Sequence, residues 1–438
     1  MVLRRPVVAL VLLGLVPALL WPGRAGLAVA LWLAGVALLV LLDVLLTPAP
    51  SLLRLERSDD PSVRLHEPTT SVLTLSNPGA RRLRGQVRDA WVPSAGAVDD
   101  RHRLDLPPGE RRRVSTALVP VRRGDRPASG VTVRLHGPLG LAGRQRTTHV
   151  PGHVRSLPPF RSRRHLPSRL ARLRQLDGRS AVRTRGQGTE FDSLRDYVEG
   201  DDVRSIDWRA TARRQHVVVR TWQPERDRRV VLVLDTSRTS AARVRDEPRL
   251  DAAMDAALLL AALASRAGDR VDLVAGDRSV RARAGSGGGP AGSGTGGLLH
   301  EMVTALAPLE PRLVEADWTA LAGAVTSLTR HRALVVLLTP LEPAAVEEGL
   351  LPVLPALTAH HRVVVASVAD PALEALREDL SSVDAVYDAA AAERTATLRH
   401  RTAAALRTLG VSVVDEPPER LPVALTDLYL TLKAQGLL

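Results

Sequence analysis

The run Val230-Val231-Leu232-Val233-Leu234 ends directly in Asp235-Thr236-Ser237-Arg238-Thr239, and this junction decides the fold of the C-terminal half. An unbroken run of β-branched and aliphatic residues is typical of a strand buried on both faces of a sheet. Similar runs follow at 271–275, 333–338, 363–368 and 411–414. Stretches with helical periodicity follow each run, at 250–267, 318–329, 344–354, 389–409 and 424–435. Strands that alternate with helices predict a doubly wound, mostly parallel α/β sheet over residues 225–438.

The end of the first strand also carries a candidate binding site. In a doubly wound sheet, ligands bind beyond the carboxyl ends of the strands, where Asp235 falls. Asp235, Ser237 and Thr239 supply one carboxylate and two hydroxyl oxygens, and Mg²⁺ prefers oxygen ligands of this kind. The glycine-rich segment 285–297 lacks the Gly-Lys-Ser/Thr ending of a phosphate-binding loop, so we expect a plain loop there and no nucleotide site.

A second informative stretch precedes this strand. Residues 188–213 read GTEFDSLRDYVEGDDVRSIDWRATAR and hold seven carboxylates and four arginines, in a chain that is only 3% aromatic. The residues that we single out as a partner-binding or structural motif are Glu190, Phe191, Arg195, Tyr197, Gly200, Asp201, Asp202, Arg204, Asp207, Trp208 and Arg213.

This acidic-aromatic stretch has two interpretations. The catalytic one treats its carboxylates, with Asp192 among them, as acid–base or metal residues, but no nucleophile–base pair or His-containing metal spacing accompanies them. The structural one uses Phe191, Tyr197, Trp208 and Trp222 as large buried anchors. The four arginines, Arg195, Arg204, Arg209 and Arg213, would then pair with neighbouring carboxylates. We favour this second interpretation, an ordered clasp that packs against the C-terminal domain and offers a partner surface.

The order of these two segments resembles the family described as domain of unknown function 58, abbreviated DUF58, whose C-terminal part is similar to a von Willebrand factor A domain. The resemblance covers most of the chain after residue 50. It implies an A-like α/β fold for the C-terminal half. Members of this family are commonly linked with AAA+ ATPases of the MoxR type, so the resemblance also implies such a partner and an adaptor role.

The resemblance also bears on the metal. A complete site in the A-domain family takes a Thr from a second loop and an Asp after the fourth strand. Here Thr339 is followed by Pro340, so that Asp is missing, and Asp317, Thr319 and Glu342 are candidates to replace it that the spacing does not decide between. Two interpretations stay open: a Mg²⁺ site, or a strand–helix turn that the same side chains shape without metal. Because one charged ligand is missing, we expect little or no Mg²⁺ affinity and no other cofactor.

The N-terminal 50 residues are apolar. Residues 6–20 form one run and residues 27–46 a second, interrupted only by Asp43. The second run has about the 20 residues that cross a bilayer. The turn-forming segment 21–26 between the runs favours a transmembrane helical hairpin over residues 1–50, rather than a signal peptide. We expect Asp43 to stay hydrated near the membrane interface.

Arginines give the orientation of this hairpin. Arg4 and Arg5 precede the first run, Arg54 and Arg57 follow the second, and only Arg24 lies between them. Positive residues are retained in the cytoplasm, so both ends of the hairpin and the soluble domains should be cytoplasmic.

The segment between the hairpin and the α/β half divides in two. Residues 51–154 show short alternating runs at 71–75, 84–92, 113–121 and 131–135, separated by turn formers. This spacing predicts a β-sandwich of immunoglobulin-like type. Residues 155–224 form an arginine-rich connector with a helix over 167–176, followed by the acidic-aromatic stretch. The connector is either a solvated linker or a patch attracted to anionic headgroups.

Composition sets limits on function. The absence of cysteine excludes disulfides and cysteine chemistry. The net charge of +13 is almost entirely arginine, because Lys433 is the only lysine. This bias is typical of a GC-rich genome, and the connector lacks interleaved aromatic residues, so we expect no nucleic-acid partner.

The sequence as a whole predicts a membrane-anchored, cytosol-facing, non-enzymatic adaptor or scaffold. It would act with a MoxR-type ATPase and other membrane proteins in protein assembly or maturation. The alternatives are a metal-dependent hydrolase that uses the acidic stretch, and a surface adhesion module, which requires the opposite topology.

Overall fold

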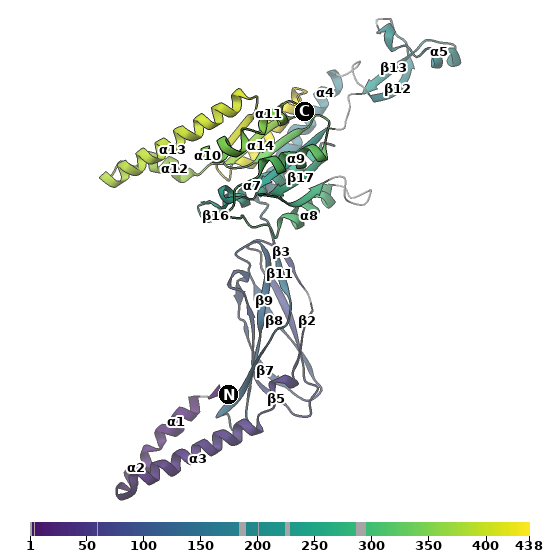
Figure 1. The fold of residues 1–438 in the computed structure, drawn as a ribbon. Helices are drawn as coiled ribbons and strands as arrows, with labels where there is room; N and C mark the ends of the chain where they lie inside the picture. The colour runs from purple at the N-terminus through teal and green to yellow at the C-terminus, as the bar shows by residue number, and fades with distance from the viewer. Residues whose placement is uncertain are drawn as a thin grey trace. The chain divides into compact units, whose positions relative to one another are not determined.

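The computed structural model describes residues 2–3, 5–58, 60–183, 190–199, 201–223, 228–285 and 295–438 (Figure 1). The chain divides into two compact units, Met1–Leu157 and Pro158–Leu438. The predicted apolar hairpin and β-rich segment therefore fall within one unit, and the connector falls with the α/β half in the other.

The first unit begins with short apolar helices and continues as strands. Its helices are α1 (Arg5–Leu13), α2 (Leu15–Leu20) and α3 (Ala25–Leu46). Its strands are β1 (Val2–Leu3), β2 (Arg54–Arg57), β3 (Ser62–Arg64), β4 (Thr69–Ser76), β5 (Leu83–Trp91), β6 (Ala97–Val98), β7 (Arg101–Leu106), β8 (Arg111–Leu118), β9 (Gly124–His136), β10 (Ala142–Thr148) and β11 (His153–Leu157). The four predicted strands of this segment are confirmed as β4, β5, β8 and β9, with shifted ends.

Two sheets of this unit share one core. A seven-stranded sheet runs in the order β1-β10-β9-β11-β3, with β5 pairing β9 and β7, and a four-stranded sheet has the order β2-β4-β8-β6. Leu73 and Leu75 of β4 belong to the same buried cluster as Val131 and Val133 of β9. Alternate residues of a strand point to one face, so the alternation in the sequence records which side chains face this core.

A buried ion pair lies inside the β-rich part. Arg57 Nη2 donates to Asp89 Oδ1 at 2.7 Å, and both side chains are almost completely buried. Thr116 Oγ1 donates to Asp89 Oδ2 at 3.0 Å, and the Arg57 guanidinium lies 4.6 Å from the Trp91 ring centroid. The prediction that Arg57 flanks the membrane is therefore wrong, because its charge is committed to a partner in the protein core.

The apolar helices pack on one another. Among the described residues, α3 is the one helix that is long and apolar enough to cross a membrane, judged by length and composition. The shorter α1 and α2 lie along it (Figure 1). Val7 of α1 shares a buried cluster with Val36 of α3, and Trp32 Nε1 donates to the Leu10 carbonyl at 2.8 Å. The predicted membrane hairpin is confirmed only as far as this single long helix.

Asp43 departs from its expected hydrated position. Its side chain is completely buried at the end of α3. Oδ1 accepts the backbone N–H of Leu139 at 2.8 Å, and Oδ2 accepts those of Leu141 and Ala142, both at 2.8 Å. The expectation of an interfacial, hydrated carboxylate is wrong, because the loop before β10 supplies the hydrogen bonds that water would otherwise make.

The second unit contains the α/β half. Its helices are α4 (Leu166–Arg183), α5 (Trp208–Arg214), α6 (Arg238–Ala241), α7 (Arg249–Arg266), α8 (Thr295–Leu306), α9 (Trp318–Leu328), α10 (Pro343–Ala345), α11 (Leu354–Thr358), α12 (Pro371–Glu378), α13 (Val383–Thr408) and α14 (Leu421–Ala434). Its strands are β12 (Glu190–Asp196), β13 (Val218–Gln223), β14 (Arg229–Asp235), β15 (Arg243–Val244), β16 (Glu247–Pro248), β17 (Arg270–Gly276), β18 (Val280–Gly285), β19 (Leu334–Leu338), β20 (Arg362–Val368) and β21 (Ser412–Glu416).

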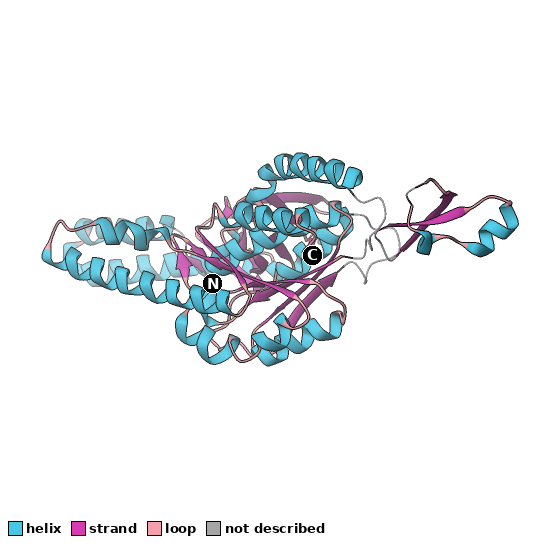
Figure 2. Cartoon of the chain, turned by 90° about the horizontal axis from the view of Figure 1, so that it is seen from above, coloured by secondary structure: helices cyan, strands magenta, loops and turns pink. Residues whose placement is uncertain are grey.

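The central sheet of this unit has the order β18-β17-β14-β19-β20-β21. Its strands pair in parallel, except for β18, which is antiparallel to β17 at one edge. Val231 and Val233 of β14 share a core with residues of α9, α11 and α13. The intervening residues face the other side of the sheet, where α7 packs on β14, β17 and β20 and in turn contacts α4 and α14. Figure 2 shows cyan helices around the magenta strands, and the predicted mixed α/β character is confirmed.

Some element boundaries differ from those predicted. The helix expected over 344–354 is divided into α10, a π-helical turn (Val346–Leu350) and α11. The connector helix α4 is longer than the predicted 167–176. Helix α12, which the Asp370 side chain caps by accepting the Ala372 N–H at 2.9 Å, was not predicted from the sequence. Most of the predicted glycine-rich loop, residues 286–294, lies outside the described residues.

Candidate functional site

The first candidate site lies at the carboxyl end of β14, where Asp235 is only 2% exposed. Its Oδ1 accepts the Ser237 N–H at 2.8 Å. Its Oδ2 accepts the hydroxyl of Thr339 at 2.7 Å and that of Thr239 at 3.1 Å. The Ser237 and Thr239 hydroxyl oxygens are 3.1 Å apart. The structure therefore brings the three predicted residues together and adds Thr339.

Parallel pairing explains why Thr339 joins this group. Strands β14 and β19 are neighbours, with Leu234 beside Leu338, so their carboxyl ends reach the same edge of the sheet. Thr339 directly follows β19, as Asp235 ends β14. The sequence analysis named Thr339 only as the residue before Pro340. The signal that identifies it is the adjacency of two buried strands that both end in oxygen-bearing side chains.

The environment of Asp235 disfavours its charge. Burial raises the pKa of this carboxyl group, because a charged form loses its hydration there. Hydrogen bonds from Ser237, Thr339 and Thr239 act in the opposite direction. These donors also satisfy the carboxylate oxygens, as an unpaired buried carboxylate would require. The arrangement is complete as a hydrogen-bonded turn, and it also offers four oxygen-bearing side chains to a small polar group.

The residues expected to complete a metal site lie elsewhere. Asp317 caps α9 by accepting the Ala320 N–H at 3.0 Å, and Glu342 binds Arg249 Nη1 at 2.8 Å. Neither of them lines the cavity beside Asp235, and nor does Thr319. Over the part of the chain that the structure describes, no three His, Cys, Asp or Glu side chains are grouped to hold a metal ion. Asp317, Thr319 and Glu342, the candidates to replace the missing Asp, therefore lie outside this cavity.

A cavity of about 280 Å³ opens beside this carboxylate. Asp235, Ser237 and Thr339 form its polar wall, and Trp318 and Glu315 lie around it. Trp318 is 5% exposed and belongs to the core of the sheet, so this wall of the cavity is rigid. The site can accept a hydrogen-bonding or charged group from a partner, and Asp235 is the buried carboxylate among the side chains that line it.

The acidic-aromatic stretch forms a separate β-hairpin. Strands β12 and β13 pair antiparallel, and α5 lies between them along the chain. Asp207 caps α5, since its Oδ1 accepts the N–H groups of Arg209 at 3.0 Å and Ala210 at 2.9 Å, and its Oδ2 binds Arg220 at 2.8 Å. These contacts, with the Ala210 N–H first, hold the pKa of Asp207 below its usual range.

Two further carboxylates of the hairpin, Asp201 and Asp202, are also engaged by nearby donors. Asp201 accepts Arg195 Nη2 at 2.5 Å and the Val198 N–H at 3.0 Å, and the Arg195 contact contributes most to a lowered pKa of Asp201. Asp202 accepts the Arg204 N–H at 2.9 Å. Each of these side chains fixes a turn, which is the structural role that the sequence predicted for the stretch.

Two parts of the clasp prediction are wrong. Trp208 is 67% exposed, and Tyr197 is 36% exposed, so neither is a buried anchor. Among the described residues, Arg204, Arg209 and Arg213 form no ion pair, and Arg220 is the second arginine that binds a motif carboxylate. The physical reason is the small size of the hairpin, because no second layer within the described part of the chain covers the aromatic rings of its two strands.

Three motif residues lie partly or wholly outside the described structure. Gly200 is not described, and nor are the side chains of Glu190 and Phe191.

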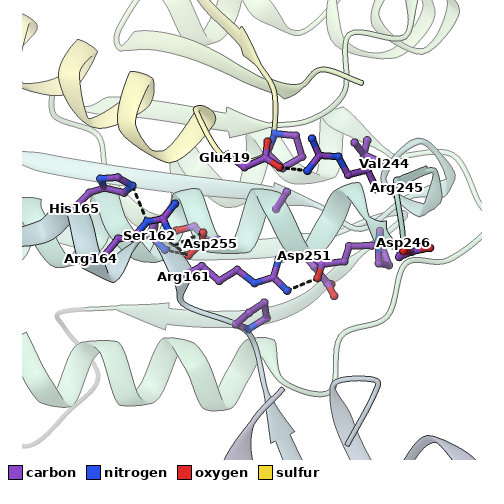
Figure 3. A pocket seen from close by; sticks show the side chains of 15 residues that line it. Arg161, Ser162, Arg164, His165, Val244, Arg245, Asp246, Asp251, Asp255 and Glu419 are labelled. Carbon is purple, nitrogen blue, oxygen red and sulfur yellow. Dashed lines mark hydrogen bonds and ion pairs between the residues drawn. The ribbon is translucent and has the colours of Figure 1, made fainter. Parts of the chain in front are cut away.

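A second cavity of the C-terminal unit was not foreseen from the sequence. It has a volume of about 280 Å³ and lies between the segment before α4, the start of α7 and the β15–β16 turn (Figure 3). Ser162 Oγ donates to Asp255 Oδ1 at 2.8 Å, and the Ser162 N–H also donates to that carboxylate at 3.2 Å. Burial raises the pKa of Asp255. These contacts hold the connector against α7, and the cavity lies beside this attachment.

A known family matches part of the second unit of the chain. Residues 193–408 match the family model described as "Protein of unknown function DUF58". The match begins in β12 and ends with α13, and so it includes most of the hairpin, the Asp235 site and most of the central sheet. The resemblance to this family is thus confirmed for these residues.

Three curated proteins are similar to the chain. They are the uncharacterized proteins Mb1516 of Mycobacterium bovis and MT1527 and Rv1480 of Mycobacterium tuberculosis. Each is 30% identical over 189 residues, which is 42% of this chain and 56% of the relative. The chain therefore spans little more than half the length of these relatives.

Proposed function

We propose that this chain is a membrane-anchored, cytosol-facing adaptor without enzymatic activity, which binds a MoxR-type AAA+ ATPase in protein assembly or maturation. Its C-terminal half would be a von Willebrand A-like domain, and a two-helix hairpin would hold it in the membrane. The partner and the domain type come from the resemblance to the DUF58 family. The role as an adaptor is supported mainly by one observation, the exposed apolar surface of the β12–β13 hairpin.

That surface combines apolar side chains with a fixed backbone. Trp208 is 67% exposed, Val203 63% and Val198 61%, and Tyr197, next to Val198 in the chain, is 36% exposed. Large aromatic residues in a fixed setting supply much contact area at low entropic cost, and they are enriched at protein interfaces. Because Asp201, Asp202 and Asp207 already fix the local turns, the hairpin would lose little freedom on binding a partner.

The same contacts weaken the case for a hydrolase. A general acid at neutral pH needs a raised pKa, and metal ligands need several carboxylates that converge on one point. In the hairpin, the pKa values of Asp201 and Asp207 are lowered, and each carboxylate binds its own local donors. These are properties of structural carboxylates.

The membrane part of the proposal rests on α3 and on its flanking charges. Arg5 precedes the apolar segment and Arg54 follows it, which favours cytoplasmic placement of both sides. The rest of the anchor would be α1 and α2, which together run back along α3.

Purification of the full chain from solubilised membranes, with mass spectrometry of the proteins that accompany it, tests this function. The proposal requires a MoxR-type AAA+ ATPase among them, in amounts comparable with the chain itself. Recovery of the chain without that ATPase from membranes that contain it would contradict the proposal.

A further inference from the structure

Two features of the C-terminal unit complement each other, and the proposed function uses neither. The first is the end of a pair of helices, α12 and α13, which projects from the strands in Figure 1. The pair is held by Arg377, whose Nε binds Glu393 at 2.6 Å and whose Nη1 binds Glu374 at 3.4 Å. The projecting end is therefore an ordered element of the fold.

The surface of this end is both apolar and acidic. Val383 and Tyr387 are each 73% exposed, Leu380 is 67% exposed and Val386 is 48% exposed. Residues 374–388 hold five carboxylates and a single arginine, in a chain with a formal net charge of +13. We call this surface, formed by Leu380, Val383, Asp384, Tyr387 and Asp388, the α13 tip. Contiguous exposed apolar side chains of this kind mark interaction sites.

The second feature is a groove with the opposite charge. Leu166, Pro167 and Leu170 line a cavity of about 350 Å³ beside the start of α4, and Arg163, Arg174 and Arg266 surround it. The three arginines are exposed, and none of them forms an ion pair with another residue that the structure describes. We call this surface, formed by these six residues, the α4 groove. Its apolar floor and free guanidinium groups suit a ligand with apolar side chains and carboxylates.

We propose that the α13 tip of one copy of this chain docks in the α4 groove of a second copy. Charge complementarity argues for this occupant, because the tip carries carboxylates and the groove carries arginines that form no ion pair with the residues that the structure describes. The tip cannot fill the groove of its own chain. The base of α13 packs on the face of the sheet that contains Val231 and Val233, whereas α4 packs on α7 and α14 at the opposite face.

Such a contact joins two different surfaces of the same protein. A head-to-tail contact of this type leaves one tip and one groove free in every pair, so it extends to rings or open chains of copies. On a membrane, the anchor would confine the copies to two dimensions and favour their encounter.

The test uses the full chain, one copy per nanodisc, so that the apolar helices stay covered by lipid. Mass photometry and sedimentation velocity would follow assembly with rising protein concentration. We expect complexes larger than one copy at low ionic strength, and fewer of them at high ionic strength, since salt screens exposed charges. Wild-type protein that remains a single copy under all these conditions would overturn the proposal.

Paired variants separate this contact from non-specific association. The tip variant carries Asp384→Arg and Asp388→Arg, and the groove variant carries Arg163→Asp and Arg266→Asp. Each alone should stay a single copy, because its one intact surface has no complement. An equal mixture should regain complexes larger than one copy, since each tip then meets a groove of opposite charge on the other variant. A mixture without such complexes, or either variant assembling like the wild type, would contradict the docking.

Single substitutions test the apolar part. Tyr387→Ser should weaken assembly about tenfold or more, as expected for an aromatic interface residue. Leu313→Ser is the matched control, because Leu313 is 83% exposed and lies outside both surfaces. It should leave assembly unchanged, and neither change should alter the melting temperature. Equal effects of the two substitutions on assembly would refute a specific tip–groove contact.

Discussion

Asp43 at the end of α3 accepts a hydrogen bond from the backbone N–H of Leu141 at 2.8 Å, across 98 residues of sequence. With the N–H groups of Leu139 and Ala142, this contact ties the long apolar helix directly to the β-rich part of the first unit. The helix is therefore fixed to the domain that follows it. In the proposed anchor, this contact would set the orientation of the first unit at the membrane.

The first prediction concerns this contact. Asp43→Ala leaves three backbone N–H groups without their acceptor, and each buried unsatisfied group typically costs about 1–3 kcal/mol. We expect a lower melting temperature in nanodiscs and faster amide exchange at Leu139, Leu141 and Ala142. Asp43→Asn keeps one acceptor oxygen and should have a smaller effect. Unchanged exchange at all three amides in Asp43→Ala would show that the contact is not maintained.

Gly137 provides an independent variant for the same contact. A methyl group added there would collide with Asp43, because the loop passes directly over the carboxylate. Gly137→Ala should therefore speed exchange at the same amides without removing the carboxylate. If it has no effect on exchange, the loop does not approach Asp43 closely.

The second prediction concerns pH. Burial raises the pKa of Asp235 in the folded state above the value of about 3.9 expected in the unfolded chain. The folded state then binds the proton more tightly, so this group's contribution to stability is present at low pH and is lost as the pH rises through the folded pKa. Asparagine does not titrate, so the stability of Asp235→Asn does not fall in this way as the pH rises. The melting temperature of Asp235→Asn minus that of the wild type should therefore be higher at pH 7 than near pH 4.

Asp207→Asn is the matched control for this pH effect, because the pKa of Asp207 is lowered instead. The sign should reverse, since stability from Asp207 is present above the unfolded pKa and is lost as the pH falls through the folded one. The melting temperature of Asp207→Asn minus that of the wild type should therefore be lower at neutral pH than in acid. The same sign for both variants would contradict the assigned environments.

The third prediction concerns Mg²⁺. The Asp235 site offers one carboxylate and three hydroxyl groups, and the hydroxyl groups of Thr239 and Thr339 already donate to that carboxylate. Mg²⁺ gives up its water reluctantly and needs near-octahedral oxygen geometry, so we expect little or no binding at physiological concentration. Calorimetric titration of the full chain, with Asp235→Ala as control, measures this. Micromolar binding that disappears in the control would favour a metal-dependent partner contact instead.

The fourth prediction concerns topology. A reporter fused after Leu438 should show a cytoplasmic location, because Arg5 and Arg54 flank the two ends of the proposed hairpin and positive residues are retained in the cytoplasm. A periplasmic or extracellular signal, or cleavage near residues 25–30, would contradict both the anchor and the adaptor proposal.

Much of the α/β half could be predicted because its signals are local. Buried parallel strands such as β14 and β19 are continuous apolar runs, and the end of a run gives the position of Asp235 without any tertiary information. The antiparallel edge strand β18 escaped notice because it is only partly buried, and its sequence alternates arginine with alanine.

Contacts between segments that are distant in the sequence leave no comparable local pattern in the sequence. The partners of Asp43 follow it by almost a hundred residues, and an isolated carboxylate in an apolar run is equally consistent with hydration. Arg57 shows the same limit, because nothing local distinguishes a membrane-flanking arginine from the buried partner of Asp89. Trp208 was expected to be buried because tryptophan usually is, whereas the hairpin has no second layer to cover it.

The central claim, that the hairpin is the face that binds the ATPase, is tested most directly by Trp208→Ala in the full chain. The side chain is exposed, so its removal should leave the melting temperature unchanged. Co-purification of a MoxR-type ATPase from solubilised membranes should fall about tenfold or more, while Leu313→Ala should retain it. Full retention of the ATPase by Trp208→Ala, or a loss that simply follows a lower melting temperature, would contradict the account.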